Sequence, residues 1–166
     1  MRRLKNELAW LGSNLAWAGL GAFLGAFGCV ILWISRGSGW YALKAMRTPM
    51  PSLALLFVLS LLSCGFCGMT AALAIRCGRS GEKRERPPHP VRHIAAAYLF
   101  GLGWYAVFFC TRMSLFGAVL LSAALLTMAV AGTEFRKRCF PAAVWMGLIP
   151  AALIDLVLLI VSLLAA

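Results

Sequence analysis

Residues 36–51 read RGSGWYALKAMRTPMP, and they separate two long apolar runs. The segment contains a Gly-Ser-Gly turn, the adjacent aromatic residues Trp40 and Tyr41, three basic residues, and a Pro-x-Pro sequence at Pro49 and Pro51. Glycine and proline in these places end one regular structure and begin the next. We therefore expect an ordered loop that caps a bundle of helices formed by the apolar runs.

The sequence on both sides of this loop is dominated by apolar residues. Of the 166 residues, 62% are hydrophobic and 13% are charged, which is more apolar surface than a soluble domain of this size buries. Five apolar segments are each near the ~20 residues that cross a hydrocarbon core of ~30 Å. They cover residues 12–35, 51–75, 94–111, 114–132 and 141–164. Because the strict alternation of a membrane barrel is absent, the sequence predicts an all-α integral membrane protein. It is expected to be a single domain over residues 1–166, a bundle of five transmembrane helices.

The basic residues predict how this bundle is oriented. The net charge is +11, but the charges lie in short segments between the apolar runs and not over one face, as a nucleic-acid footprint requires. The amino terminus, residues 76–92 and residues 136–138 hold twelve Lys and Arg, whereas the opposite side holds four. The positive-inside rule then places the amino terminus in the cytoplasm and the carboxyl terminus outside. We expect a multi-pass protein of a bacterial cytoplasmic membrane, with the lipid bilayer and no nucleic acid as partner.

Cysteine and histidine residues raise the question of a redox or metal site. Cys64 and Cys67 have C-x-x-C spacing, but they lie inside an apolar segment with no second such motif, so packing between helices is the favoured interpretation. His89 and His93 would share a helix face, but the prolines around His89 argue against a helix there. The sequence therefore predicts no metal site and no required cofactor.

Small residues recur along the first apolar segment. Gly21 and Gly25 stand four apart, with further glycines and alanines at the same spacing. Such a face lets another helix approach closely. The partner is either a helix of the same chain or a second copy in a homodimer, and the pattern fits both.

Asp155 is the one acidic residue well inside an apolar segment. A carboxylate at that depth costs on the order of 2.5–3.5 kcal/mol on insertion scales, so it should face the bundle interior and be paired or protonated. Its role is either structural, as a bond to a neighbouring helix, or functional.

Three stretches carry a family-like pattern. Residues 40–51 begin with W-Y-x-x-L, residues 98–109 contain W-x-x-x-F-F, and residues 148–155 contain a proline at position 150. With five spans and many tryptophans, these stretches resemble the TspO/MBR family, the tryptophan-rich sensory or translocator proteins. The family has an asparagine where this chain has Gly101, and a tyrosine and a tryptophan where it has Ala151 and Ile154.

The resemblance implies a central pocket between the helices that opens toward the first loop. It implies a planar hydrophobic ligand of the tetrapyrrole class, such as a porphyrin or haem-type molecule, and for some members a light-dependent breakdown of porphyrin. The residues that it assigns to the pocket come from the first loop and the third and fifth spans. They are Trp40, Tyr41, Pro49, Pro51, Gly101, Trp104, Phe108, Pro150, Ile154 and Asp155.

Two functions are expected from these features. The first is a ligand-binding or sensory membrane protein, in which Trp40, Tyr41, Trp104 and Phe108 offer flat faces to a hydrophobic small molecule. The alternative is a small transporter or permease subunit that uses Asp155 as a proton- or ion-coupled group. No Ser/His pair or pair of carboxylates indicates an enzyme, so catalytic residues are not predicted.

Overall fold

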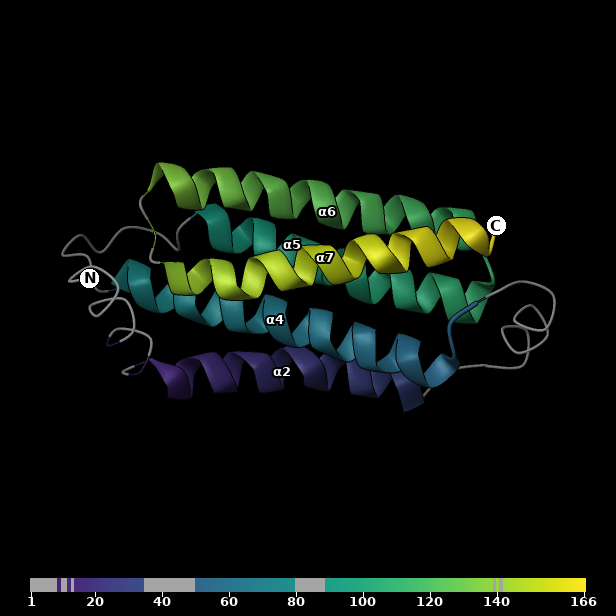
Figure 1. The fold of residues 1–166 in the computed structure, drawn as a ribbon, viewed down its shortest axis with the longest axis horizontal. Coiled ribbons are helices and arrows are strands. Elements are labelled where there is room, and N and C mark those ends of the chain that lie inside the picture. The colour runs from purple at the N-terminus through teal and green to yellow at the C-terminus, as the bar shows by residue number, and fades with distance from the viewer. Residues whose placement is uncertain are drawn as a thin grey trace.

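The computed structural model describes residues 9, 12, 14–34, 50–79, 89–138, 140 and 142–166. These residues form long helices and, within the described ranges, no strand, which confirms the all-α fold class. The helices run side by side along one direction, with the start of α2 and the end of α7 at opposite ends of the bundle (Figure 1). They are α2 (Leu15–Ile34), α4 (Leu53–Arg79), α5 (His89–Ala106), α6 (Ser114–Lys137) and α7 (Ala142–Leu164), and a π-helical segment, η1 (Val107–Thr111), continues α5.

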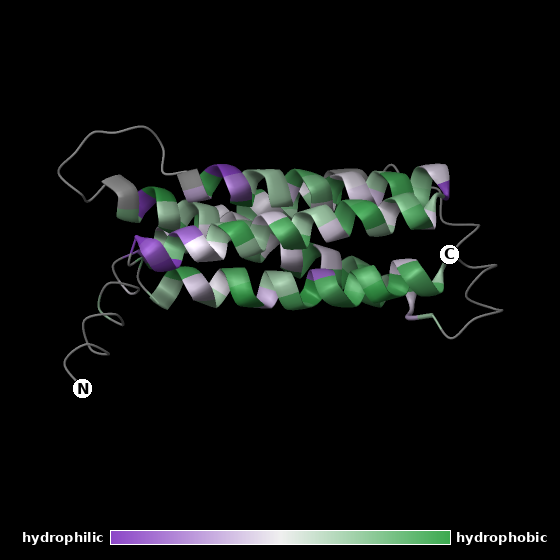
Figure 2. Cartoon of the chain, turned by 90° about the horizontal axis from the view of Figure 1, so that it is seen from above, coloured by the Kyte–Doolittle hydropathy of each residue, from purple (hydrophilic) through white to green (hydrophobic). Residues whose placement is uncertain are grey.

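Four helical stretches are long and apolar enough to cross a membrane, by length and composition. They are Leu53–Cys77, Pro90–Thr111, Ser114–Lys137 and Ala142–Leu164, and the apolar stretch Leu15–Val30 in α2 is shorter. Large hydrophobic side chains such as Phe23, Leu99 and Leu126 point outward, as in a surface solvated by lipid. Hydrophilic helix segments gather at the end where α4 and α6 finish and α5 begins (Figure 2).

The helices close into a ring that does not follow the chain order. α2 packs on α4, α4 on α7, α7 on α6 and α6 on α5, and α5 returns to α4 and α2. α4 therefore touches three other helices and lies between α2 and α7 (Figure 1).

Glycines set the close approach of α2 and α4. A Cβ on Gly25 would overlap the carbonyl oxygen of Cys64, and a Cβ on Gly68 would overlap that of Gly21. The two backbones touch here because neither helix carries a side chain at the contact. The small-residue face of α2 is thus occupied by α4 of the same chain.

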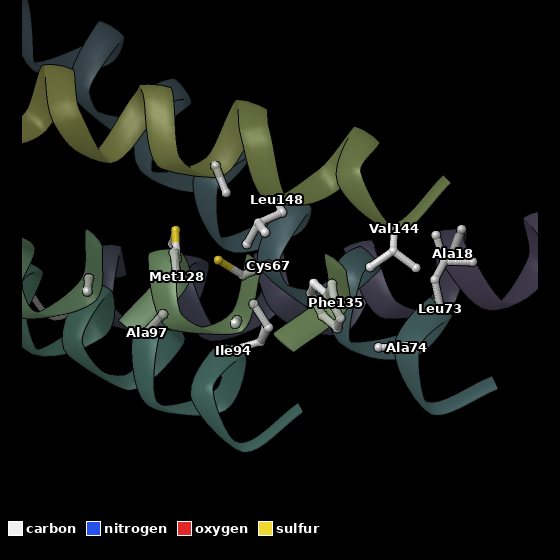
Figure 3. Close-up of a cluster of buried hydrophobic side chains, with 13 residues drawn as sticks. Ala18, Cys67, Leu73, Ala74, Ile94, Ala97, Met128, Phe135, Val144 and Leu148 are labelled. Atoms are coloured by element: carbon white, nitrogen blue, oxygen red, sulfur yellow. The ribbon is translucent and has the colours of Figure 1, made fainter. Parts of the chain in front are cut away.

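The core consists of two clusters of buried side chains. The first joins α4, α5, α6 and α7 around Cys67, Ile94, Met128 and Leu148, which point toward one another in Figure 3. The second lies nearer the carboxyl terminus and is aromatic. Its largest members are Trp104, Tyr105, Phe108 and Phe109.

Three helix boundaries differ from the sequence-based expectation. The prolines around His89 were expected to exclude a helix there, and this prediction is wrong, because α5 begins at His89 with Pro90 in its first turn. Proline is tolerated at that position because the first turn of a helix leaves its N–H groups without intrahelical partners. In α4 and α6 the helix continues to Arg79 and Lys137, beyond the apolar stretches, since helical hydrogen bonding does not stop where hydrophobicity does.

Candidate ligand site

Asp155 lies in the interior of the bundle, on α7. Asp155 is only 2% exposed, and the Ser63 hydroxyl of α4 donates a hydrogen bond to its Oδ1 at 2.5 Å. The side chain therefore faces inward and is bonded to a neighbouring helix, as expected for an acid at membrane depth.

Trp104 forms a second polar link to α7. The indole Nε1 donates to the Ser162 hydroxyl at 2.7 Å, and this hydroxyl in turn donates to the carbonyl of Leu158 at 3.0 Å. The indole ring stacks on Phe108 with ring centroids 5.2 Å apart. Trp104 thus joins α5 to α7 by a hydrogen bond and by ring packing.

Two pairs of consecutive aromatic residues are interior at the end of α5 and in η1. In η1, Phe108 and Phe109 are both buried, and their rings lie edge to face with centroids 5.0 Å apart. Trp104 and Tyr105, in the α-helical part just before η1, are both buried as well. The core therefore takes neighbouring rings from both kinds of helix.

The space around Asp155 is small. The void that a water-sized sphere can occupy there is about 10 Å³, and its lining includes Ser63, Gly101, Trp104 and Asp155. Such a volume suits about one water molecule. Ligand sites usually measure ~300–1,000 Å³. The structure therefore brings these predicted residues together around a closed interior, with Phe108 stacked on Trp104.

Three other predicted site residues that the structure describes do not line this void. Ile154 is half-buried and packs on the aromatic cluster, Pro150 is half-buried inside α7, and Pro51 precedes the start of α4. The predictions for Trp40, Tyr41 and Pro49 fall outside the described residues.

A much larger space opens between α2, α4 and α5, and we call it the α2–α5 groove. Its volume is about 390 Å³. Small residues of α2 and α4 form its floor, while Trp17 and Tyr98 stand at its sides. The lining consists of Trp17, Leu20, Gly21, Leu24, Gly25, Cys67, Gly68, Ala71, Ala72, Ile75, Ile94, Ala95 and Tyr98. None of the predicted site residues that the structure describes belongs to it.

Polar groups lie beside the α2–α5 groove. Arg76 Nε donates to Asn14 Oδ1 at 3.1 Å, and the guanidinium carbon lies 5.9 Å from the ring centroid of Trp17. This distance is within the range of a cation–π interaction. Deeper in the groove, the Tyr98 hydroxyl donates to the carbonyl of Gly25 at 3.0 Å. The groove is therefore apolar along its length, and the Arg76 guanidinium lies beside Trp17, one of its lining residues.

Sequence reasoning missed this groove, although one signal pointed toward it. The glycines of the first apolar segment predicted a close helix approach, and the same glycines leave a hollow beside that contact. The hollow itself depends on how far α5 stands from α2, which no local pattern encodes.

The described part of the chain contains no cluster of side chains suited to hold a metal ion. Among the described residues no group of three His, Cys, Asp or Glu is arranged to hold a metal ion, and Cys64 and Cys67 are buried free thiols. The C-x-x-C pair lies on one side of α4 and packs between helices.

No family model matches the chain, and comparisons with curated proteins and with solved structures give no match either. The resemblance to the TspO/MBR family therefore rests on the three sequence stretches given above, and the site is argued from its geometry.

Proposed function

We propose that the chain is a membrane ligand-binding protein of the sensory type, resembling TspO, that takes a planar hydrophobic molecule of the porphyrin class between its helices. The observation that carries the proposal is the α2–α5 groove. Its volume of about 390 Å³ falls in the usual range for ligand sites, and its walls are apolar and aromatic.

The position of the groove suits a ligand that reaches the protein from the bilayer. The groove lies between helices and is bordered by exposed residues such as Leu20 and Ala95, so a hydrophobic molecule can enter sideways. The Arg76 guanidinium lies beside Trp17 of the groove, and guanidinium groups pair with carboxylates. A flat ring with acidic substituents combines the two properties that this arrangement recognises.

The alternative location is the interior beside Asp155. A ligand of that size there would have to part α7 from its neighbours, since the present void holds about 10 Å³. Such a movement would break the Ser63–Asp155 or the Trp104–Ser162 hydrogen bond. The α2–α5 groove needs no such rearrangement, which is why we favour it.

The test is a titration of protoporphyrin into the purified protein in lipid nanodiscs, followed by the absorbance of the porphyrin. Ala95→Trp fills the α2–α5 groove from α5 and is expected to weaken binding about tenfold or more, because overpacking costs ~1–3 kcal/mol. Leu99→Trp is the matched control. Leu99 lies one turn further along α5, is 65% exposed and does not line the groove.

Two results would contradict parts of this proposal. If Trp40→Ala and Trp104→Phe weaken binding while Ala95→Trp does not, the ligand occupies the interior beside Asp155 and the groove assignment is wrong. If the protein binds no more porphyrin than empty nanodiscs do, the ligand-binding function itself is wrong.

A second candidate function is proton- or ion-coupled transport through Asp155. It is favoured by one observation, the buried carboxylate next to a void of about one water molecule. Proteoliposomes loaded with a pH-sensitive dye would report proton movement. Coupling through the carboxylate predicts that Asp155→Asn abolishes it, and an unchanged rate would remove Asp155 from the role.

A further inference from the structure

A second groove runs between α6 and α7, on a part of the surface not used by the α2–α5 groove. We call it the α6–α7 groove, and its volume is about 360 Å³. Its lining is apolar over most of its length and polar at one end. The lining residues are Leu125, Met128, Ala129, Gly132, Thr133, Arg136, Trp145, Leu148, Ile149 and Ala152. Ala129, Thr133 and Ile149 are exposed, so the groove opens outward to the surroundings of the bundle.

The length of the groove matches one leaflet of a bilayer. Leu125 and Arg136 mark its two ends on α6, and eleven residues of helix at 1.5 Å each span about 16 Å. Half of a hydrocarbon core of ~30 Å is about 15 Å. The apolar part therefore begins near the bilayer centre, and Arg136 lies near the membrane surface.

The polar end of the groove carries an excess of positive charge. The Glu134 carboxylate forms ion pairs with Lys137 Nζ at 3.2 Å and with Arg138 Nε at 3.7 Å. Among the described residues Arg136 forms no ion pair, so three cations face one carboxylate over residues 134–138. Trp145 lines the same end, in the position of an interfacial aromatic residue.

From this arrangement we propose that the α6–α7 groove binds an acidic glycerophospholipid of the cytoplasmic leaflet. One acyl chain lies along the apolar part, beside Ala129 and Leu148, and the headgroup phosphate pairs with Arg136. A guanidinium binds phosphate through two parallel hydrogen bonds, and the surplus positive charge favours an acidic over a zwitterionic headgroup.

A second copy of the chain fits the groove less well. Two copies inserted in the same orientation would bring their residue 136–138 cations to the same membrane edge, where like charges repel. An acidic lipid instead supplies the opposite charge at that edge.

The headgroup is tested by native mass spectrometry of the full chain, purified with equal amounts of phosphatidylglycerol and phosphatidylcholine. The unmodified protein should retain mainly phosphatidylglycerol. Arg136→Gln should lower that retention about fivefold, the effect of one cation near an anionic surface. Lys137→Gln removes the same charge one residue away, from a side chain that is 71% exposed and paired with Glu134, and should lower retention less than about twofold.

The acyl chain is tested with a variant that fills the groove. Ala129→Trp should abolish the retention of phosphatidylglycerol, while Val130→Trp, on the neighbouring exposed position outside the lining, should leave it unchanged. If Ala129→Trp does not fold, Ile149→Trp fills the same groove from α7.

Several outcomes overturn the proposal. Equal losses for Arg136→Gln and Lys137→Gln would mean unspecific attraction by charge, and equal retention of the two lipids would mean no headgroup selection. Displacement of the lipid by glycerol phosphate alone would remove the role of the acyl chain. A dimer that disappears with Ala129→Trp would show that a second copy occupies the groove.

Discussion

Asp155 is held in the interior by one serine from another helix. Ser63 of α4 donates to its carboxylate, whereas Ser60, one turn earlier on the same helix, donates to the Leu56 carbonyl within α4. The two serines are equally buried, but only Ser63 joins two helices. A comparison of substitutions at Ser63 and Ser60 therefore separates the free energy of an interhelical hydrogen bond from that of burying a hydroxyl group.

Ser63→Ala is expected to lower the free energy of unfolding by about 1–2 kcal/mol, because a buried acid loses its donor. Ser60→Ala should cost less than about 0.5 kcal/mol, since the Leu56 carbonyl keeps its place in the helix. Thermal or SDS unfolding of the detergent-solubilised variants, followed by tryptophan fluorescence, measures both. Equal costs for the two substitutions would show that the Ser63–Asp155 bond contributes nothing.

Trp104→Phe removes the bond to Ser162 and keeps a ring stacked on Phe108. We expect a loss of about 1 kcal/mol, and about the same for Ser162→Ala. The double variant should be little worse than either single one, because both remove the same bond. Additive losses in the same unfolding assay would contradict a direct Trp104–Ser162 interaction.

The elements of the fold were predictable to the extent that they follow from hydrophobicity. Five apolar segments predicted five helices, because a backbone in hydrocarbon must satisfy its own hydrogen bonds. The ring order was not predictable, since every span is apolar all round and its length says nothing about its neighbour. The inward position of Asp155 followed from its charge, but its partner Ser63 depends on how α4 and α7 are rotated.

Local geometry also hid two features of α5. The start of α5 at His89 was not predicted, because the sequence alone does not distinguish a proline in the first turn of a helix from a proline that ends a helix. The π-helical turn that contains Phe108 and Phe109 has no sequence signature that the chain displays. Of the predicted site residues, Trp104, Phe108 and Asp155 are buried in the core, and the open α2–α5 groove was not predicted.

The close packing of α2 on α4 gives a testable prediction about glycine substitutions. Gly25→Ala is expected to lower the free energy of unfolding by about 1–3 kcal/mol, because the new methyl group would overlap the backbone of α4 at Cys64. Gly19→Ala is the matched control in the same helix. No atom lies within 4 Å of a Cβ there, and alanine favours a helix by about 1 kcal/mol over glycine, so stability should stay equal or rise. Equal destabilisation by both changes would argue against the α2–α4 packing.

At the scale of the whole molecule, the charges and both grooves share one end of the bundle. Arg76 lies beside Trp17 of the α2–α5 groove and Arg136 lines the α6–α7 groove, and both arginines lie near the carboxyl ends of their helices, α4 and α6. The excess of Lys and Arg predicts, by the positive-inside rule, that this end is cytoplasmic. Both openings would then face the inner leaflet.

This orientation is tested with reporter fusions in bacteria. Alkaline phosphatase fused after Ala166 should be active, because the carboxyl terminus is expected outside, and a fusion after Arg138 should be inactive. Green fluorescent protein at the same two places should give the opposite pattern. Inverted results from both reporters would place the cation-rich end outside.

Helix α4 lines both the α2–α5 groove and the void at Asp155. Its Cys67 and Gly68 form part of the α2–α5 groove, and its Ser63 and Cys64 border the void at Asp155. Ser63 and Cys67 are one helical turn apart on α4. If α4 moves as a rigid helix, a displacement at the groove also displaces the residues at the void. A ligand that displaced α4 from the groove side would therefore also displace Ser63, the hydrogen-bond donor of Asp155. In that case the two sites would be coupled, and by thermodynamic reciprocity a change at Asp155 would alter the affinity of the groove.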